Sequence, residues 1–271
     1  MDRELVDAYL GRIGAQRPEE PNGAALRHLQ ERHVLSIPFD NLSFHLNEPI
    51  LHGEDSAKRV VHEGRGGGCF ELNTAFALLL DALGFQVEML VARIYRGQKL
   101  SSAFGHMVLR VQTCDTSGPV TGGLPAAGDL WMVDVAQGGN SRWPLRIDSL
   151  SPQSDPHGSY RLVRTAQGDI DVLCDEVPLY CVETRPRDLE FCAPTIWWYQ
   201  TSPDSPFRKR LLCVQPRTDG RVMLTGRILI RDLDGCRTRE KIDDDEELKK
   251  VLQTYFGTRL DRLPDILLAS A

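Results

Sequence analysis

The chain has 271 residues and a formal net charge of -6, with 41% hydrophobic and 26% charged residues. These fractions are those of an ordinary globular protein that can bury a sizeable core. Because the balance is acidic and no long basic block occurs, nucleic acid is not expected as a partner.

The amino-terminal residues and the cysteines exclude further classes. Charges at Asp2, Arg3, Glu4 and Asp7 stand where a signal peptide has its apolar core, and no stretch is long enough to cross a bilayer. We therefore expect a cytoplasmic protein with no membrane partner. The seven cysteines are irregularly spaced and include no C-x-x-C pair, so neither a disulfide framework nor a metal site is expected.

The first third of the chain has the apolar periodicity of helices. Pro38 takes residues 37–42 out of the helical conformation, because it restricts the residue before it. The last helix of this part is apolar on nearly every side and stops at Gly84, so it is expected to be buried. The predicted helices cover residues 3–13, 24–35, 56–61 and 70–83.

From Gln86 the apolar period changes to two, which predicts strands. Two of them, residues 106–111 and 130–135, flank a linker full of turn residues. Strand and turn signals recur to about Leu189, which is typical of a barrel or a curled antiparallel sheet. The last part begins near Phe191. It predicts an aromatic cluster, strands around residues 210–214 and 222–231, and a helix from residue 243 to Gly257.

Cys69 lies where a glycine run meets the buried helix. Three glycines, residues 66–68, let the backbone turn sharply and leave no side chain over the sulfur. At a helix amino end, unpaired N–H groups and the positive end of the dipole favour a thiolate. The alternative is a small buried hydrophobic residue, but such a cysteine does not need a glycine run beside it.

A cysteine nucleophile needs a base, and the base needs a group that orients it. His106 is the best placed histidine, because it opens a predicted strand directly after Gly105. A lone histidine on a strand is usually structural, so a partner is required. The competing histidines lie on helical stretches or in polar loops: His28, His33, His45, His52, His62 and His157.

Hairpin geometry provides that partner. If the two predicted strands pair antiparallel and symmetrically about residue 120, His106 lies opposite Asp134. Facing residues point to the same side of a sheet, so the imidazole and the carboxylate can meet. Asp134 shares its face with apolar residues, where a carboxylate is costly unless it is paired. The alternative role of Asp134 is to cap local backbone at a turn, but the strongest constellation is a Cys69, His106 and Asp134 triad.

The residues resemble the arylamine N-acetyltransferase family, and the match covers nearly the whole chain. The most specific segment is Arg-Gly-Gly-Gly-Cys-Phe-Glu-Leu-Asn at 65–73. The other matching segments, in chain order, are Ile-Pro-Phe-Asp-Asn-Leu at 37–42, Gly-His-Met at 105–107, Val-Asp-Val at 133–135 and Trp-Tyr-x-x-Ser-Pro-x-Ser-x-Phe at 198–207.

The resemblance implies an α+β fold with a papain-like Cys-His-Asp core. A helical domain over residues 1–85 would carry the nucleophile. An antiparallel β-barrel domain over residues 86–190 would carry the histidine and the aspartate. An α/β lid domain would follow over residues 191–271.

The resemblance also implies ping-pong chemistry. Cys69 would take an acetyl group from acetyl coenzyme A as a thioester and pass it to an arylamine or arylhydrazine, with His106 as base and Asp134 as its orienting group. No tightly bound cofactor is implied, since acetyl coenzyme A is a substrate. Gly138 and Gly139 resemble the family's turn near the coenzyme phosphates. The residues expected to border the substrate are Phe39, Gly68 and Gly105.

Several positions depart from the family pattern. The family often has an aromatic residue at Gly68, Ser or Thr at Gly105, and Gly followed by an aromatic residue at Ala136 and Gln137. Losing bulk beside the nucleophile predicts a wider acceptor site. The alternative function is therefore an amide synthase that releases a polyketide from an acyl carrier protein by forming a macrolactam. Two roles are considered for Arg65: it supports the loop for catalysis, or it forms a structural ion pair.

Two other classes remain as rivals. A cysteine hydrolase could use the same triad, but an acyltransferase must protect its thioester from water, and the apolar surroundings of Cys69 favour the latter. A binding protein without activity is least expected, because all three triad positions are filled.

Overall fold

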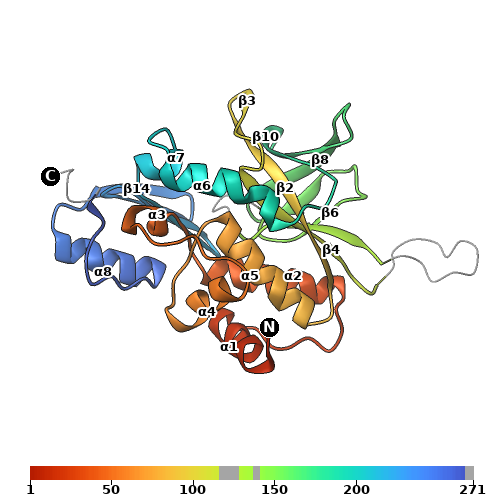
Figure 1. The fold of residues 1–271 in the computed structure, drawn as a ribbon, viewed down its shortest axis with the longest axis horizontal. Helices are drawn as coiled ribbons and strands as arrows, with labels where there is room; N and C mark the ends of the chain where they lie inside the picture. The colour runs from red at the N-terminus through yellow and green to blue at the C-terminus, as the bar shows by residue number, and fades with distance from the viewer. Residues whose placement is uncertain (116–127, 137–140, 266–271) are drawn as a thin grey trace, which may run out of the picture.

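The computed structural model describes residues 1–115, 128–136 and 141–265. Figure 1 shows the amino-terminal helices in the lower middle of the view, a curled sheet to one side of them, and a second sheet with α8 to the other side. The helices are α1 (Arg3–Ile13), α2 (Gly23–Ser36), α3 (Leu42–Leu46), α4 (Glu54–His62), α5 (Cys69–Ala82), the 3-10 helix η1 (Leu189–Cys192), α6 (Ala193–Thr201), α7 (Pro206–Lys209) and α8 (Asp245–Phe256).

The strands fall into two groups along the chain. The first group follows α5: β2 (Gln86–Arg96), β3 (Lys99–Leu100), β4 (His106–Gln112), β5 (Leu130–Val133), β6 (Leu145–Arg146), β7 (Gln153–Asp155), β8 (Gly158–Arg164), β9 (Ile170–Cys174) and β10 (Val177–Val182). The second group lies near the carboxyl end, except for β1: β1 (Phe39–Asp40), β11 (Leu212–Arg217), β12 (Gly220–Thr225), β13 (Ile228–Leu233) and β14 (Cys236–Lys241).

The helix α5 begins at the nucleophile candidate and runs through the core. Its first turn is closed by Glu71, whose Oε2 accepts the Gly68 backbone N–H at 2.9 Å and so satisfies a donor that the helix itself leaves free. It ends where Gly84 adopts a left-handed φ of +91°. Its apolar side chains belong to a hydrophobic cluster with α1, α2 and one face of β2, β4 and β5. The predicted buried helix is confirmed.

The first sheet is a nearly closed antiparallel barrel, as expected. Its path runs β6-β5-β4-β2-β10-β9-β8-β7, with β3 paired to β2. The two edges meet through the side chain of Gln153, whose Oε1 accepts the Arg146 N–H at 2.8 Å and whose Nε2 donates to the Arg146 carbonyl at 3.0 Å. A second hydrophobic cluster, including Tyr160 and Tyr180, fills the interior.

The second sheet has the order β1-β11-β12-β13-β14. Its first strand comes from the amino-terminal part, since Phe39 pairs with Val214 and Asp40 with Cys213. A third hydrophobic cluster joins this sheet to α8. The three-domain division at residues 85 and 190 stays a prediction. Within the described ranges, no helix has the length and apolar character needed to span a bilayer.

The prediction of a single strand over residues 222–231 is wrong. β12 and β13 are two strands of a tight hairpin, with Thr225 paired to Ile228 and Gly226 at a φ of +58° in the turn. The apolar alternation continues across this turn, so the one glycine was the only local signal. β14 was not predicted, because all six of its residues are exposed and lack an apolar face.

Candidate active site

Cys69 is the first residue of α5 and is 5% exposed. The glycine run before it lies against β1: the Gly67 carbonyl accepts the Asp40 N–H at 3.0 Å. A Cβ built on Gly66 would stand 2.1 Å from the Pro38 carbonyl oxygen, so only glycine fits there without a shift of the backbone. The loop is therefore held by its fit against residues 38–40.

Buried charges support the loop from below. Arg65 bonds Glu48 with 3.2 Å between Nη2 and Oε2, and Arg59 bonds Glu71 with 3.2 Å between Nη1 and Oε1. Burial, and to a lesser extent the charge of Asp40, raise the pKa of Glu71 to about 7, against the lowering effects of the Gly68 N–H and Arg59. Arg65 thus makes an ion pair with Glu48, which fits both roles considered for it, and a catalytic role of Arg65 stays a prediction.

His106 and Asp134 meet, with 2.7 Å between Nε2 and Oδ2, and each is 2% exposed. The predicted register is nevertheless wrong by two residues, because Leu109 pairs with Val133. A shift of two residues keeps every side chain on the same face of the sheet, so the contact survives. β5 also ends at Val133, since polar side chains take over the backbone bonds beyond it.

Asn73 is the side chain that takes over those bonds. It is fully buried on α5, and its Nδ2 donates to Asp134 Oδ1 at 3.0 Å and to the Met107 carbonyl at 2.7 Å. Its Oδ1 accepts the Val135 N–H at 3.1 Å. One amide therefore ties the helix of Cys69 to both strands that carry the histidine and the aspartate. Asn73 lies at the end of the segment 65–73, and no role was predicted for it from the sequence.

The electrostatics at His106 favour the charged imidazolium. Burial lowers its pKa, but the charge and hydrogen bond of Asp134, followed by the hydrogen bond and charge of Cys69, raise it to about 10. The ring also packs edge-on against Tyr180, with 5.4 Å between centroids. The thiol, the imidazole and the carboxylate are thus buried together, and their charges act on one another.

A pocket of about 300 Å³ opens onto Cys69 and His106. Phe39 and Gly105 line it, and their contact with the substrate stays a prediction; Ala136 and Phe207 also line it. The lining residues that sequence reasoning missed come from β2 and from the carboxyl-terminal sheet: Ile94, Arg96, Leu212, Val214, Arg221 and Met223.

The wider acceptor site stays a prediction, and the two glycines differ in the space around them. A Cβ on Gly68 would meet only Glu71 Oε2 at 3.8 Å, so space is open there, although Gly68 does not line the pocket. At Gly105 the Tyr199 hydroxyl fills the space, 2.5 Å from where a Cβ would stand, and it donates to the Gly105 carbonyl at 3.2 Å. Gly138 and Gly139 lie outside the described residues.

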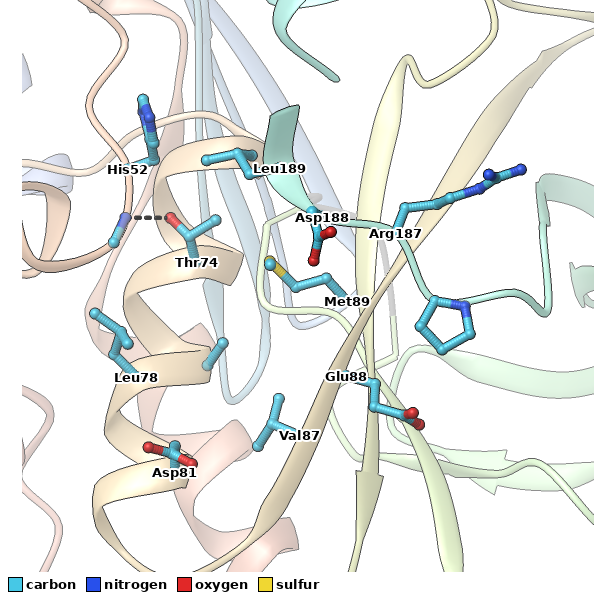
Figure 2. A pocket seen from close by; sticks show the side chains of 13 residues that line it. His52, Thr74, Leu78, Asp81, Val87, Glu88, Met89, Arg187, Asp188 and Leu189 are labelled. Atoms are coloured by element: carbon cyan, nitrogen blue, oxygen red, sulfur yellow. Dashed lines mark hydrogen bonds between the residues drawn. The ribbon is translucent and has the colours of Figure 1, made fainter. Parts of the chain in front are cut away.

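A larger pocket of about 460 Å³ contains none of the predicted site residues. It lies between α5 and β2 and is bordered by residues 186–189 (Figure 2). Thr74 lies on its α5 side, where the Thr74 hydroxyl accepts the Gly53 N–H at 2.8 Å. Of the predicted catalytic residues, Cys69 and His106 therefore line the smaller pocket and none lines the larger one.

Comparisons with known proteins identify the family of the chain. A family model described as N-acetyltransferase matches residues 24–265. The arylamine N-acetyltransferase of Mycolicibacterium smegmatis is 31% identical over 272 residues, covering 95% of this chain and 93% of the relative.

Solved structures are similar over almost the full length. The arylamine N-acetyltransferase from Salmonella typhimurium has a TM-score of 0.85 at 26% identity and covers 99% of this chain and 100% of its own. The Mycobacterium marinum enzyme in complex with CoA has a TM-score of 0.83 at 25% identity, with 97% of both chains covered. The chain therefore belongs to the arylamine N-acetyltransferase family and is an acyltransferase.

Proposed function

We propose that this enzyme transfers an acetyl group from acetyl coenzyme A, through a thioester on Cys69, to an aromatic amine or hydrazine. The observation that carries the proposal is the 2.7 Å contact between His106 and Asp134 beside Cys69, in a pocket with apolar walls. The Mycobacterium marinum relative solved in complex with CoA supports the coenzyme as donor.

In the first half-reaction the Cys69 thiolate attacks the thioester carbonyl carbon of the donor. The bond between that carbon and the coenzyme sulfur breaks, and the departing sulfur takes the proton held by His106. The raised pKa of His106, about 10, favours an imidazolium that can give this proton. Asp134 and Asn73 hold the ring and the carboxylate in position.

In the second half-reaction the amine nitrogen attacks the Cys69 thioester. The nitrogen gives its proton to His106, and Cys69 leaves as a thiolate. In both steps negative charge grows on the carbonyl oxygen. The Cys69 backbone N–H lies in the first turn of α5 and accepts this role, since it donates to no acceptor within the described ranges.

Intact-mass spectrometry after mixing with acetyl coenzyme A tests the proposal. We expect a gain of one acetyl group on Cys69, discharged by a small arylamine, and no gain in Cys69→Ser, which keeps the other six cysteines. Absence of acetylation would overturn the coenzyme donor. Rapid hydrolysis of the thioester without an amine would favour a hydrolase instead.

The orienting role of Asp134 has its own test. Asp134→Asn should retain the fold but lose most turnover, by about 10²–10⁴-fold, because the amide cannot stabilise the imidazolium or fix its tautomer. Near-normal turnover in this variant would contradict the role.

The amide synthase is the second candidate. Gly68 does not line the pocket, but it adjoins Cys69 and leaves open space where the family often has an aromatic side chain. It uses the same three side chains with a carrier-protein thioester as donor. Loading of Cys69 from a polyketide thioester, together with no loading from acetyl coenzyme A, would select it. Gly68→Phe separates the two functions further, because the added ring should impair a bulky acyl chain more than an acetyl group.

A further inference from the structure

We propose that Arg96 and Arg221 bind a carboxylate on the substrate of this pocket, so that the enzyme prefers an anionic amine or acyl group to a neutral one. This inference rests on the proposed function and names the substrate class of the same site. The two guanidinium groups come from different sheets: Arg96 ends β2 in the barrel, and Arg221 lies on β12.

Both arginines lie on the pocket that contains Cys69 and His106. No Asp or Glu lines it, so the lining carries the charge of two arginines with no acidic side chain against them. The chain as a whole is acidic, with a net charge of -6, which makes this local excess of positive charge specific to the site.

Within the described ranges, neither guanidinium is bound by another side chain or by the backbone. No ion pair within 4.0 Å and no hydrogen bond of either side chain is found there. The residues outside those ranges include no Asp or Glu side chain. Arg221 lies opposite Asp232 on the neighbouring strand, and both border a neighbouring pocket. Their side chains form no ion pair within 4.0 Å. Arg96 faces Lys99, another cation.

Arg96 and Cys69 line the same pocket, so an anion held by Arg96 lies in the cavity that contains the reacting sulfur. Arg96 also lowers the pKa of the Tyr199 hydroxyl, which burial and the charge of Cys69 raise to about 12. The phosphates of coenzyme A are at the far end of the pantetheine arm from the sulfur that reacts, so they fit this place poorly.

The chemistry of arginine selects the ligand. A guanidinium is permanently charged and presents a planar fork that matches a carboxylate with two parallel hydrogen bonds. The other walls are apolar, with Ile94, Leu212, Val214 and Met223. These walls suit an aromatic ring or a short acyl chain between the carboxylate and the reacting carbonyl or nitrogen.

Matched pairs of substrates test the proposal in two arms. In the acceptor arm, 4-aminobenzoate is compared with 4-aminobenzamide at fixed acetyl coenzyme A. In the donor arm, succinyl coenzyme A is compared with butyryl coenzyme A at fixed 4-aminobenzamide. We expect kcat/KM to favour the carboxylate by at least about tenfold in one arm, which identifies the substrate that carries it.

Arg96→Gln and Arg221→Gln should each remove most of that preference, because they should lower kcat/KM for the carboxylate substrate more than for its neutral partner. Lys99→Gln and Arg239→Gln remove the same charge from the two sheets without touching the pocket and should keep the preference. The proposal is overturned if neither arm prefers the carboxylate, if both Gln variants keep the preference, or if they change only the KM of acetyl coenzyme A.

Calorimetry on Cys69→Ala separates this proposal from the proposed function. 4-Aminobenzoate or a succinyl thioester should bind more tightly than its neutral partner, and Arg96→Gln in the same background should abolish the difference. This result would support the arginine pair even if Cys69 took no acetyl group. Equal binding of both partners, with Cys69 acetylation intact, would overturn the pair alone.

Discussion

At the scale of single residues, the side chain of His106 is buried, and its charge depends on the Asp134 carboxylate and the Cys69 thiol. The 2.7 Å contact with Asp134 stabilises the protonated imidazolium near neutral pH. Burial alone would favour the neutral ring, so the two neighbours decide the outcome. The charge state of His106 can therefore be tested by titration and by removing one of these neighbours.

His106 should stay protonated up to about pH 10, as followed by NMR titration of histidine-labelled protein. Because its pKa in the folded protein is raised from 6.5, the stability it contributes is complete below pH 6.5 and is lost as pH rises through about 10. In Cys69→Ala the pKa should fall, since the hydrogen bond and charge of the thiol are removed. A wild-type His106 that titrates below pH 7 would contradict this.

Glu71 gives a second test at residue scale. Its pKa is raised from 4.5 to about 7, so its contribution to stability is present below pH 4.5 and is lost as pH rises through 7. The free energy of unfolding of the wild type should therefore fall relative to Glu71→Gln between these pH values, by up to roughly 3 kcal/mol.

Urea denaturation of both proteins at pH 5 and pH 8 measures this difference. Glu54→Gln is a control that should not reproduce the trend, because its side chain is exposed and Lys58 lowers its pKa. Parallel stability curves for the wild type and Glu71→Gln would show that the buried carboxyl group does not titrate in this range.

At the scale of elements, the glycine loop before α5 depends on Gly66 more than on Gly68. Gly66 approaches the Pro38 carbonyl too closely for any side chain, whereas Gly68 has a φ of -83° and open space around it. Three consecutive glycines look alike in sequence. The packing against residues 38–40 distinguishes them.

Gly66→Ala should lower the free energy of unfolding by about 1–3 kcal/mol, because the loop must move away from Pro38. It should also slow the alkylation of Cys69 by iodoacetamide, since the loop positions that residue. Gly68→Ala is the matched control and should cost less than about 1 kcal/mol. Equal losses in the two variants would contradict the fit described for Gly66.

At the scale of the whole molecule, single amide side chains join segments far apart in the chain. Asn41, which is 3% exposed, donates to the carbonyls of Phe207 and Arg210, both at 2.9 Å, and accepts the Leu212 N–H at 2.7 Å. It thereby holds β11, one wall of the reactive pocket, against the amino-terminal part. Asn73 does the same for the barrel strands.

Asn41→Ala leaves two carbonyls and one N–H without this partner, so it should destabilise the protein by about 1–3 kcal/mol or more. Hydrogen exchange should show lost protection in β11. Asn41→Asp keeps the acceptor for Leu212 but places a carboxylate oxygen against the two carbonyls, and it should be no better than alanine. Unchanged protection of β11 in both variants would show that Asn41 is not the connection.

The amino-acid sequence predicted those elements whose stability is local. α1 covers residues 3–13 as expected, and α5 starts within one residue of its predicted position. Periodicity, caps and a terminal glycine are all written within the segment itself. β14 has no such signal, because its exposed residues are held as a strand only by pairing with β13.

By itself, the sequence determined the meeting of His106 with Asp134, because an even shift of register preserves the face of the sheet. The tertiary structure alone decided which residues complete the pocket beyond Phe39 and Gly105. Arg96 and Arg221 lie more than a hundred residues apart, and only the packing of the barrel beside the carboxyl-terminal sheet brings them to one cavity. Such contacts depend on folding across the whole chain, and no local pattern of residues encodes them.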